Sequence, residues 1–448
     1  MSLTSQEPLS SQRVLDVLRA GFPLPEFTAD FDDTRAQAIL NETARRLQEN
    51  YPYHHPFYLG QMLKPPHPLA REAYHLAMYL NPNNHALDGG RASSHLEKEA
   101  VAQIAGMFGW ETHLGHLTSG GTFANLEALW IARELAPGQV VLASQQAHYT
   151  HQRISAVLGI PFRSVPVDAR GCMDLSALDY ELRQGDVGTV VATLGTTAAG
   201  TVDPLPGILS LREKYGFRLH VDAAYGGYFM LASRLTSAVR TVFDGLPHVD
   251  SIVIDPHKHG LQPYGCGCIL FRDPAVGRFY RHDSPYTYFT SAEMHLGEIS
   301  LECSRPGASA VALWATIELL PLVPGGEFAH ALDSCLEAAH QLKEFLQSTQ
   351  RFVPLLEPSL DIVVWAVRSP SARQASAAAQ RYFELAAAQD IHLALASFPR
   401  QLVEPCQAIG TWDADSVTCL RSCLMKPEHL PWMPEITRRM EAALSALG

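Results

Sequence analysis

Short, nearly continuous apolar runs alternate with helical patterns through the middle of the chain. These runs are rich in aliphatic and β-branched residues, which is typical of strands buried on both faces. The strands expected here are Val140–Ala143, Ser164–Val167, Thr189–Leu194, Arg218–Asp222, Ser251–Asp255 and Cys268–Phe271. Helical spacing recurs at Phe123–Glu134, Leu175–Arg183 and Ile208–Lys214. The alternation predicts an α/β fold with a mainly parallel central sheet and helices on both faces.

The two ends of the chain carry different patterns. Residues 1–60 predict an N-terminal helical segment, in which helical spacing at 37–47 gives way to a proline-rich stretch. Residues 61–325 would form the large domain that contains the sheet. Residues 326–448 would form a smaller C-terminal α+β domain, with the Pro321–Gly326 turn as the boundary.

Further helices and strands are expected outside the central sheet. Before the sheet we expect a helix at Leu69–Met78 and another whose start is capped by Ser94 and Glu97, spaced as in a capping box. Later in the chain the pattern predicts helices at Ala308–Leu320, Ala329–Leu346, Ala372–Ala387 and from Pro434 onward, and strands at Ile362–Val367 and Ser416–Met425.

Composition narrows the classes of function. The formal net charge of -12 argues against a surface that binds nucleic acid or an anionic membrane. No apolar stretch is long enough to span a bilayer, and the first residues lack the basic-then-apolar order of a signal peptide. The eight cysteines show no zinc-site spacing and fit reduced thiols in a large chain. We therefore expect a cytoplasmic protein.

A lysine follows one of the predicted strands directly. The apolar run 251–254 ends in Asp255-Pro256-His257-Lys258, so Lys258 should lie in a loop at the carboxyl edge of the sheet. Functional groups of parallel sheets collect at that edge. A lysine in a loop is usually a solvated surface residue, but burial and cationic neighbours can make its amine nucleophilic enough to form a Schiff base.

Other residues at the same edge supply what such a lysine needs. Ser119-Gly120-Gly121-Thr122 precedes a helix, where free backbone amides can bind a phosphate. Asp222 ends an apolar strand and could pair with a pyridine nitrogen, and Ala224 beside it leaves room for a flat ring. His148 could stack on that ring. Each feature alone is commonly structural, but together they indicate a pyridoxal phosphate site.

Two histidine pairs have a spacing that is also found in metal sites. They are His113 with His116 and His148 with His151. Neither pair has a third ligand in a recognisable pattern, so we predict no metal site.

The order of five motifs resembles the group II pyridoxal-dependent decarboxylases, which include bacterial and archaeal tyrosine, glutamate and diaminobutyrate decarboxylases. The motifs are Ser119–Leu126, Gln146–His148, Thr193–Pro204, His220–Tyr225 and Asp255–Lys258. The resemblance is close over about residues 60–325 and loose in the C-terminal domain. It implies a type I aminotransferase-like fold and a homodimer whose active sites lie at the interface.

The resemblance also implies roles for individual residues. Lys258 would form an imine with pyridoxal 5'-phosphate, Asp222 would pair with the ring nitrogen, and His148 would stack on the ring. The residues that would hold the phosphate or line the ring are Ser119, Gly120, Gly121, Thr122, His257, Thr196 and Ala224.

The residues that would bind the substrate match the family pattern less closely. Tyr286 and Tyr288 lie near the position of a family tyrosine that returns a proton to the substrate in the neighbouring subunit's site, although either could be a core aromatic. Arg421 resembles the arginine that binds the substrate carboxylate in bacterial glutamate-type enzymes, and Arg305 is its rival or an interface or phosphate-side residue. A polar loop with Asn84 and His85 is the expected wall of the substrate pocket.

We therefore predict an enzyme that decarboxylates an L-amino acid to an amine and carbon dioxide. The same constellation also serves carbon–carbon lyases, aldehyde-forming oxidative deaminases and aminotransferases, and a non-catalytic interaction protein is a further alternative. Diaminobutyrate, aspartate, glutamate and tyrosine stay open as substrates, with an aromatic or basic side chain slightly preferred.

Overall fold

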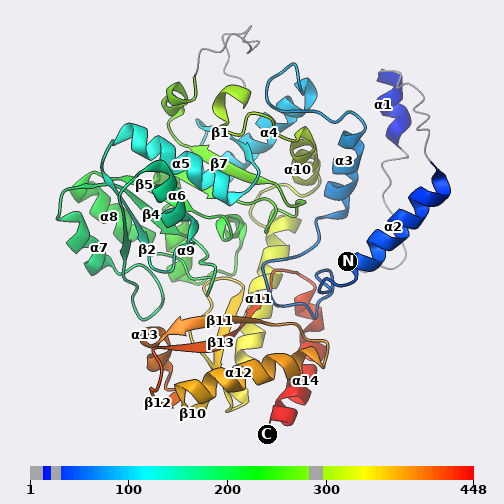
Figure 1. The fold of residues 1–448 in the computed structure, drawn as a ribbon. Helices are drawn as coiled ribbons and strands as arrows, with labels where there is room; N and C mark the ends of the chain where they lie inside the picture. The colour runs from blue at the N-terminus through cyan, green and yellow to red at the C-terminus, as the bar shows by residue number, and fades with distance from the viewer. Residues whose placement is uncertain (1–13, 22–31, 282–295, 448) are drawn as a thin grey trace.

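The computed structural model describes residues 14–21, 32–281 and 296–447, and its centre is a seven-stranded sheet (Figure 1). The strand order is β1-β7-β6-β5-β4-β2-β3. The strands are β1 (Leu114–Thr118), β2 (Val140–Ser144), β3 (Phe162–Val165), β4 (Val187–Thr193), β5 (Arg218–Asp222), β6 (Ser251–Ile254) and β7 (Gly267–Phe271). Neighbours from β3 to β6 pair in parallel, while β7 is antiparallel to both β6 and β1. The prediction of a mainly parallel sheet is confirmed.

Helices cover both faces of this sheet. They include α4 (Arg91–Met107), α5 (Gly121–Leu135), α6 (Thr150–Leu158), α7 (Leu175–Leu182), α8 (Leu205–Tyr215) and α9 (Ser237–Phe243). Alternate residues of a strand point to opposite sides. Ile252 and Ile254 of β6 share an apolar cluster with residues of α4, α7, α8 and α9, whereas Val253 packs with Ala124 and Ala128 of α5. The strands are therefore buried on both sides, as their continuous apolar runs predict.

The helix before the sheet begins earlier than the sequence predicts. Gly90 is the N-cap of α4 and no side chain caps this end, so the predicted capping box of Ser94 and Glu97 is wrong. Both residues are buried inside the helix. The carboxylate of Glu97 instead makes a tertiary contact, in which it accepts a hydrogen bond from the backbone N–H of Leu117 at 2.9 Å. On its other side α4 packs against α10 (Gly307–Leu319), which also contacts α3 (Pro68–Met78).

The C-terminal part is a smaller α+β unit. Its antiparallel sheet has the order β11-β13-β9-β8, and α11, α12 and α14 bury an apolar cluster against it. The elements are α11 (Glu327–Ser348), β8 (Phe352–Pro354), β9 (Ile362–Val367), β10 (Ser369–Ser371), α12 (Ala372–Ala387), β11 (Ala394–Pro399), α13 (Arg400–Val403), β12 (Ile409–Thr411), β13 (Ser416–Cys423) and α14 (His429–Leu447). The last helix begins at His429, not at Pro434, and Pro434 lies inside it. Pro431 lies in the first turn, whose N–H groups have no helical partner.

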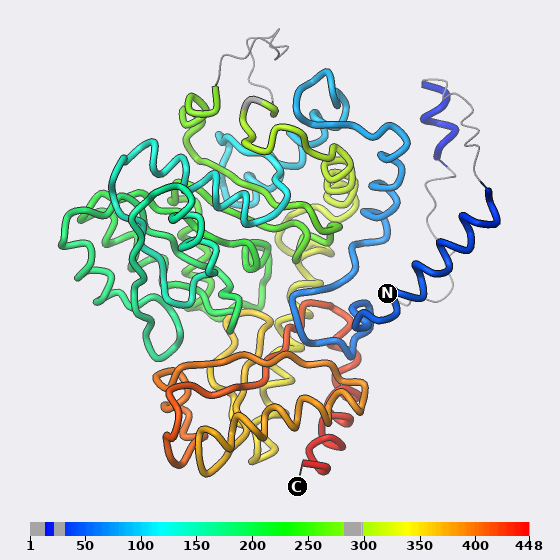
Figure 2. Tube along the Cα trace, in the orientation of Figure 1, coloured from blue at the N-terminus to red at the C-terminus, as the bar shows by residue number. Residues whose placement is uncertain are grey.

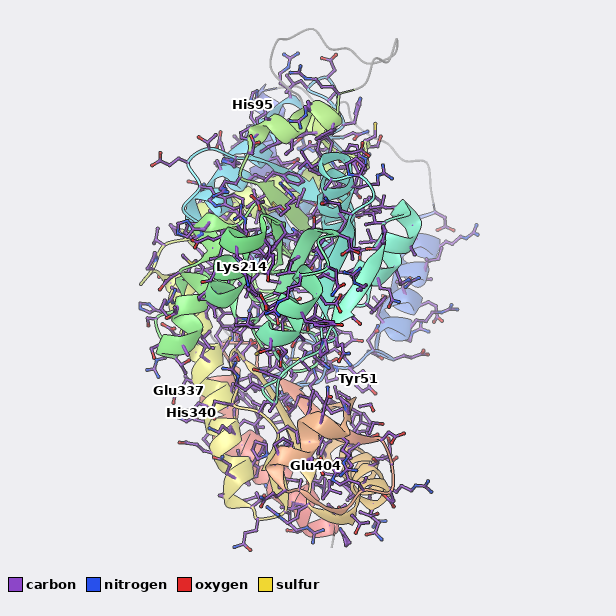
Figure 3. The ribbon with its side chains drawn as sticks, turned by 90° about the vertical axis from the view of Figure 1, so that its left-hand side faces the viewer. Tyr51, His95, Lys214, Glu337, His340 and Glu404 are labelled. Atoms are coloured by element: carbon purple, nitrogen blue, oxygen red, sulfur yellow. The ribbon has the colours of Figure 1, made fainter. Side chains whose placement is uncertain are left out.

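The first and last described helices lie in different parts of the molecule. In Figure 2 the N-terminal helices α1 (Leu15–Gly21) and α2 (Asp33–Leu47) stand at the side of the large domain, and the chain ends in the small domain. Figure 3 shows His95 of α4 at one end of the molecule and Glu404 of the small domain toward the other. Among the helices that the structure describes, none is both long and apolar enough to cross a membrane.

Candidate active site

A glycine turn joins β1 to α5 at the carboxyl edge of the sheet. Gly120 has φ +151°, a conformation that favours glycine, and a Cβ on Gly121 would lie 2.8 Å from Oδ2 of Asp255. No side chain caps the start of α5 at Gly120. The unpaired amides and the positive end of the helix dipole make this turn suitable for an anion. In this chain the backbone N–H of Ser119 donates to Oε2 of Glu302 at 2.8 Å.

A cavity of about 330 Å³ opens beside this turn. Its walls come from loops that follow β1, β2, β4, β5 and β6. The lining residues are Ser119, Gly120, Gly121, Thr122, Phe123, Asn125, His148, Thr150, Thr193, Gly195, Thr197, Asp222, Ala224, Tyr225, Asp255, His257 and Lys258. The cavity thus brings together the glycine turn, the lysine and the aspartate that the sequence singles out.

Asp222 is held by donors from three elements. Its Oδ2 accepts hydrogen bonds from Nε2 of His151 at 2.9 Å and from Nδ2 of Asn125 at 3.3 Å, and its Oδ1 accepts one from the N–H of Ala224 at 3.1 Å. Burial alone would raise the pKa of Asp222, but the hydrogen bond from His151 and the charge of Lys258 hold that pKa well below its ordinary value. Asp222 is therefore an ionised carboxylate in the cavity wall.

Lys258 lies beside a second carboxylate. Its Nζ is 3.1 Å from Oδ2 of Asp255, whose side chain is 3% exposed, and the lysine itself is partly exposed to the cavity. Nε2 of His257 lies 3.5 Å from the same oxygen, and burial lowers the pKa of His257. Oδ1 of Asp255 has no hydrogen-bond partner among the described residues. Asp255 therefore orients the lysine while keeping spare acceptor capacity.

His148 and the turn after β4 complete the walls. His148 is half-buried, its Nδ1 is hydrogen-bonded to Oγ1 of Thr150, and burial lowers its pKa. Thr196, expected to line the ring, is fully buried and its hydroxyl is 2.8 Å from that of Thr201. Thr197 faces the cavity instead. Thr196 does not line this cavity, because its hydroxyl closes the turn, and its role beside the ring stays a prediction.

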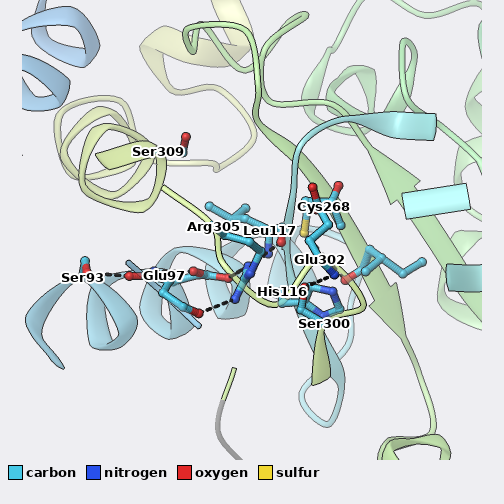
Figure 4. A network of polar contacts seen from close by, with 12 residues as sticks. Ser93, Glu97, His116, Leu117, Cys268, Ser300, Glu302, Arg305 and Ser309 are labelled. Atoms are coloured by element: carbon cyan, nitrogen blue, oxygen red, sulfur yellow. Dashed lines mark hydrogen bonds and ion pairs between the residues drawn. The ribbon is translucent and has the colours of Figure 1, made fainter. Parts of the chain in front are cut away.

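Arg305 and Asn84, both expected at the substrate, belong to a buried polar network, and Figure 4 shows Arg305 against Glu97 in it. Nη1 of Arg305 donates to Oε1 of Glu97 at 2.7 Å and to the carbonyl of Leu117, and Nη2 donates to the carbonyl of Asn84 at 3.1 Å. The side-chain amide of Asn84 donates to Glu97 and accepts from Ser93. These contacts occupy the amide of Asn84 and both terminal nitrogens of Arg305, and only Nε of Arg305 has no partner among the described residues. Substrate-binding roles for Asn84 and Arg305 are therefore not supported.

Arg421 and His85 are not among the residues that line the cavity. Arg421 is 4% exposed on β13, and its Nη1 donates to Oε1 of Gln61 at 3.0 Å. Its Nε and Nη2 have no partner among the described residues. His85 is half-buried in the loop before α4. Tyr286 and Tyr288 lie outside the described residues.

Several residues of the site are ones that sequence reasoning did not assign. Asn125 lies inside the Ser119–Leu126 motif, and its position one helical turn after Gly121 could have placed it on the cavity side. His151 appears in the sequence only as half of a histidine pair. The contact of His151 with Asp222 joins α6 to β5, which are separated by 71 positions, and no local pattern carries it.

The combined geometry fits a flat, anionic ring compound with a reactive carbonyl. The turn at Gly120 offers amides to an anionic group, Asp222 offers a carboxylate to a ring nitrogen, and Lys258 offers an amine. The small side chain of Ala224 leaves space in the wall. The described residues contain no cluster of three or more His, Cys, Asp and Glu that could hold a metal ion.

Comparison with known proteins agrees with this chemistry. The model of the pyridoxal-dependent decarboxylase conserved domain matches residues 76–368. An L-tyrosine decarboxylase of Enterococcus faecium is 28% identical over 454 aligned residues, which cover 77% of this chain and 74% of the relative. A probable L-aspartate decarboxylase of Pyrococcus furiosus is 30% identical over 315 residues, which cover 69% of this chain and 82% of the relative.

A solved structure shows the same fold. The crystal structure of Oryza sativa TDC with PLP and tryptamine matches with a TM-score of 0.78 and 19% identity, covering 99% of this chain and 93% of that one. With the family model spanning the sheet, the cavity and the lysine loop, the chain belongs to the pyridoxal-dependent decarboxylase family and is an amino acid decarboxylase that uses pyridoxal 5'-phosphate as its cofactor.

Proposed function

We propose that Lys258 is the residue that binds the cofactor covalently and that the amino group of an L-amino acid substrate takes its place during the reaction. The observation that carries this proposal is the cavity itself. Lys258, Asp222 and the open end of α5 at Gly120 share one cavity at the carboxyl edge of the sheet. Asp255, at 3.1 Å, holds the Lys258 amine toward that space.

The phosphate end would be held by the glycine turn. Gly121 and Thr122 offer backbone amides, Ser119 and Thr122 offer hydroxyls, and His257 offers a ring N–H. Gly120 gives the turn its shape, while the N–H of Ser119 is taken by Glu302. A Cβ on Gly121 would press on Asp255, which explains why glycine suits this position.

At the ring end, Asp222 would pair with the ring nitrogen, while His148 and Ala224 would lie against the two ring faces and Thr197 at the edge. When bound, pyridoxal phosphate supplies a conjugated ring that accepts the electron pair left by the departing carbon dioxide. The ionised state of Asp222 keeps a proton on the facing ring nitrogen. The partly enclosed wall limits water near the reacting carbon.

We assign Arg421 to the substrate carboxylate. Two of its nitrogens are buried without a partner among the described residues, which is costly unless a ligand completes them. Its charge also reaches Tyr225, a cavity residue, where it opposes the rise in pKa caused by burial. A planar carboxylate would match the fork of N–H groups. From the sequence alone, Tyr286 or Tyr288 remains the proposed proton donor.

We further propose a cytoplasmic homodimer with domains at 1–60, 61–325 and 326–448. No residue of α2 is buried, and its Ile39, Leu40 and Leu47 are exposed, which supports contact with a second copy. All eight cysteines are free thiols, as in a reducing compartment.

The test is a substrate screen on the holoenzyme. Each proteinogenic amino acid, 2,4-diaminobutyrate and ornithine is supplied, and carbon dioxide and product mass are measured together, with Lys258→Ala as the control. An amine and carbon dioxide that are both lost in the variant support the proposal and name the substrate. Aldehyde with ammonia, or a keto acid without carbon dioxide, would contradict decarboxylation as the main reaction. Activity retained by Lys258→Ala would overturn the role of the lysine.

A further inference from the structure

The carboxylate of Asp222 does not stand alone but is the end of a buried chain of polar groups. Nε2 of His220 lies 2.8 Å from Oδ1 of Asn125, and Nδ1 of His220 lies 2.9 Å from Oγ of Ser251. Asn125 in turn donates to Asp222. All of these side chains are at least nine-tenths buried, and so is His151, which contacts Asp222 from α6.

The chain has one consistent set of donors and acceptors. Since a carboxylate only accepts, the amide of Asn125 must present Nδ2 to Asp222 and its oxygen to His220. His220 therefore carries its proton on Nε2 and accepts from Ser251 through Nδ1. Burial lowers the pKa of His220 to about 3, so this arm is neutral and contributes only dipoles.

On its other side the Asp222 carboxylate is contacted by a single residue, His151. Nε2 of His151 donates to Oδ2 of Asp222 at 2.9 Å, the shortest of the three contacts to this carboxylate. Nδ1 of His151 has no partner among the described residues, so Asp222 alone fixes which ring nitrogen carries the proton. The pair is 0% and 5% exposed, where a charged or hydrogen-bonded neighbour acts with little screening by solvent.

From these contacts we infer that His151 is a positioning residue, which holds the Asp222 carboxylate ionised and aimed at the ring nitrogen of the cofactor. This inference rests on the role proposed above for Asp222. The titratable groups that face Asp222 are His151 on α6, His220 on its own strand, Lys258 after β6 and His148 after β2. Of these, His151 is the one that donates directly to the carboxylate.

Comparing the binding of two ligands can distinguish a positioning role of His151 from a role in packing alone. Pyridoxal phosphate carries the ring nitrogen, and its 1-deaza analogue has a C–H there while keeping the aldehyde and the phosphate. Dissociation constants of both are measured by absorbance titration of the full-length apoprotein. The variants are His151→Leu, which removes the donor, and His151→Gln, which keeps one. His113→Leu is a matched control, because His113 is a half-buried histidine outside the cavity wall.

We expect His151→Leu to weaken pyridoxal phosphate binding about tenfold and analogue binding no more than about twofold. His151→Gln should stay within about threefold of wild type for both ligands, and His113→Leu should match wild type. If the leucine variant does not fold, as judged by thermal unfolding of the apoprotein, His151→Ala removes the donor without adding bulk.

Equal losses for both ligands would mean that His151 only packs, and would overturn this inference while leaving the cofactor site intact. Loss of binding in His151→Gln equal to that in His151→Leu would overturn it as well. If wild type binds the two ligands equally, the proposed role of Asp222 fails instead. The two failures are therefore distinguishable.

Discussion

Two buried arginines in this protein have opposite surroundings. Arg305, in the large domain, pairs both terminal nitrogens of its guanidinium with Glu97 and two backbone carbonyls, and only its Nε has no partner among the described residues. Arg421, in the small domain, has a single neutral partner, Gln61, and two nitrogens without any among the described residues. A buried cation with its own carboxylate is a structural element, whereas one without a carboxylate is ready for an anionic ligand. The difference teaches that burial alone does not mark a binding residue.

A second buried cation, Lys426, follows Arg421 closely in the sequence of the small domain. Lys426 is 4% exposed, and its Nζ donates to the backbone carbonyl of Tyr58 at 2.6 Å. Burial and the charge of Lys64 lower the pKa of Lys426 to about 7. By contrast, Glu97 lies directly against Arg305 in the network of Figure 4.

Removing Glu97 should have the largest effect. Glu97→Ala leaves the buried Arg305 without its carboxylate, and we expect the free energy of unfolding to fall by about 3–5 kcal/mol. Urea unfolding at fixed protein concentration measures this change. The double variant Glu97→Ala/Arg305→Met should recover most of the loss, because no unpaired charge remains. A single variant as stable as wild type would show that the ion pair does not hold this region.

Removing Arg421 should instead weaken substrate binding. Arg421→Met should raise KM about 10- to 100-fold, since a charged hydrogen bond to the substrate carboxylate is lost. Unfolding of the apoprotein should be unchanged or need more urea, because a poorly paired cation leaves the interior. Steady-state kinetics and urea unfolding are compared in the same preparation. An unchanged KM with reduced stability would place Arg421 in the same class as Arg305.

The pH dependence of stability should reveal the lowered pKa of Lys426. The pKa of Lys426 is lower in the folded protein than in the unfolded chain, so between about pH 7 and 10.5 the unfolded chain binds more protons. Stability should therefore rise with pH in this window, and the unfavourable contribution of Lys426 is complete below it. Relative to Lys426→Met, wild type should gain about 3–4 kcal/mol from pH 7 to pH 10. A constant difference between the two proteins would contradict the lowered pKa.

A carboxylate introduced beside Arg421 should give it a charged partner, as Glu97 already does for Arg305. Oε1 of Gln61 lies 3.0 Å from Nη1 of Arg421, so Gln61→Glu gives Arg421 a charged partner. We expect stability to rise by about 1 kcal/mol or less and KM to increase a few-fold, because the new carboxylate competes with the substrate. Gln103→Glu, at a residue of α4 whose side chain contacts Glu318, is the control and should leave KM unchanged. A KM that stays at the wild-type value in Gln61→Glu would argue against a substrate contact for Arg421.

The elements and the principal residues of the cavity follow from local sequence. Lys258, Asp222, His148 and the turn at Gly120 each lie at the end of an apolar strand or at the start of a helix. In a parallel sheet those ends meet at one edge, so adjacency in space follows from topology. The strand β1 was not predicted, because it is short and its apolar pattern is interrupted by Gly115 and His116.

Only the tertiary structure determines which buried polar groups pair with one another. The sequence spacing of Ser94 and Glu97 is that of a helix cap, yet Glu97 pairs with Arg305, 208 positions away. Likewise His151 belongs to a histidine pair in the sequence but contacts Asp222 across the sheet. Periodicity reports only which face of an element is buried. Buried polar partners are chosen by three-dimensional proximity, because each desolvated group must find a complementary group wherever the chain brings one.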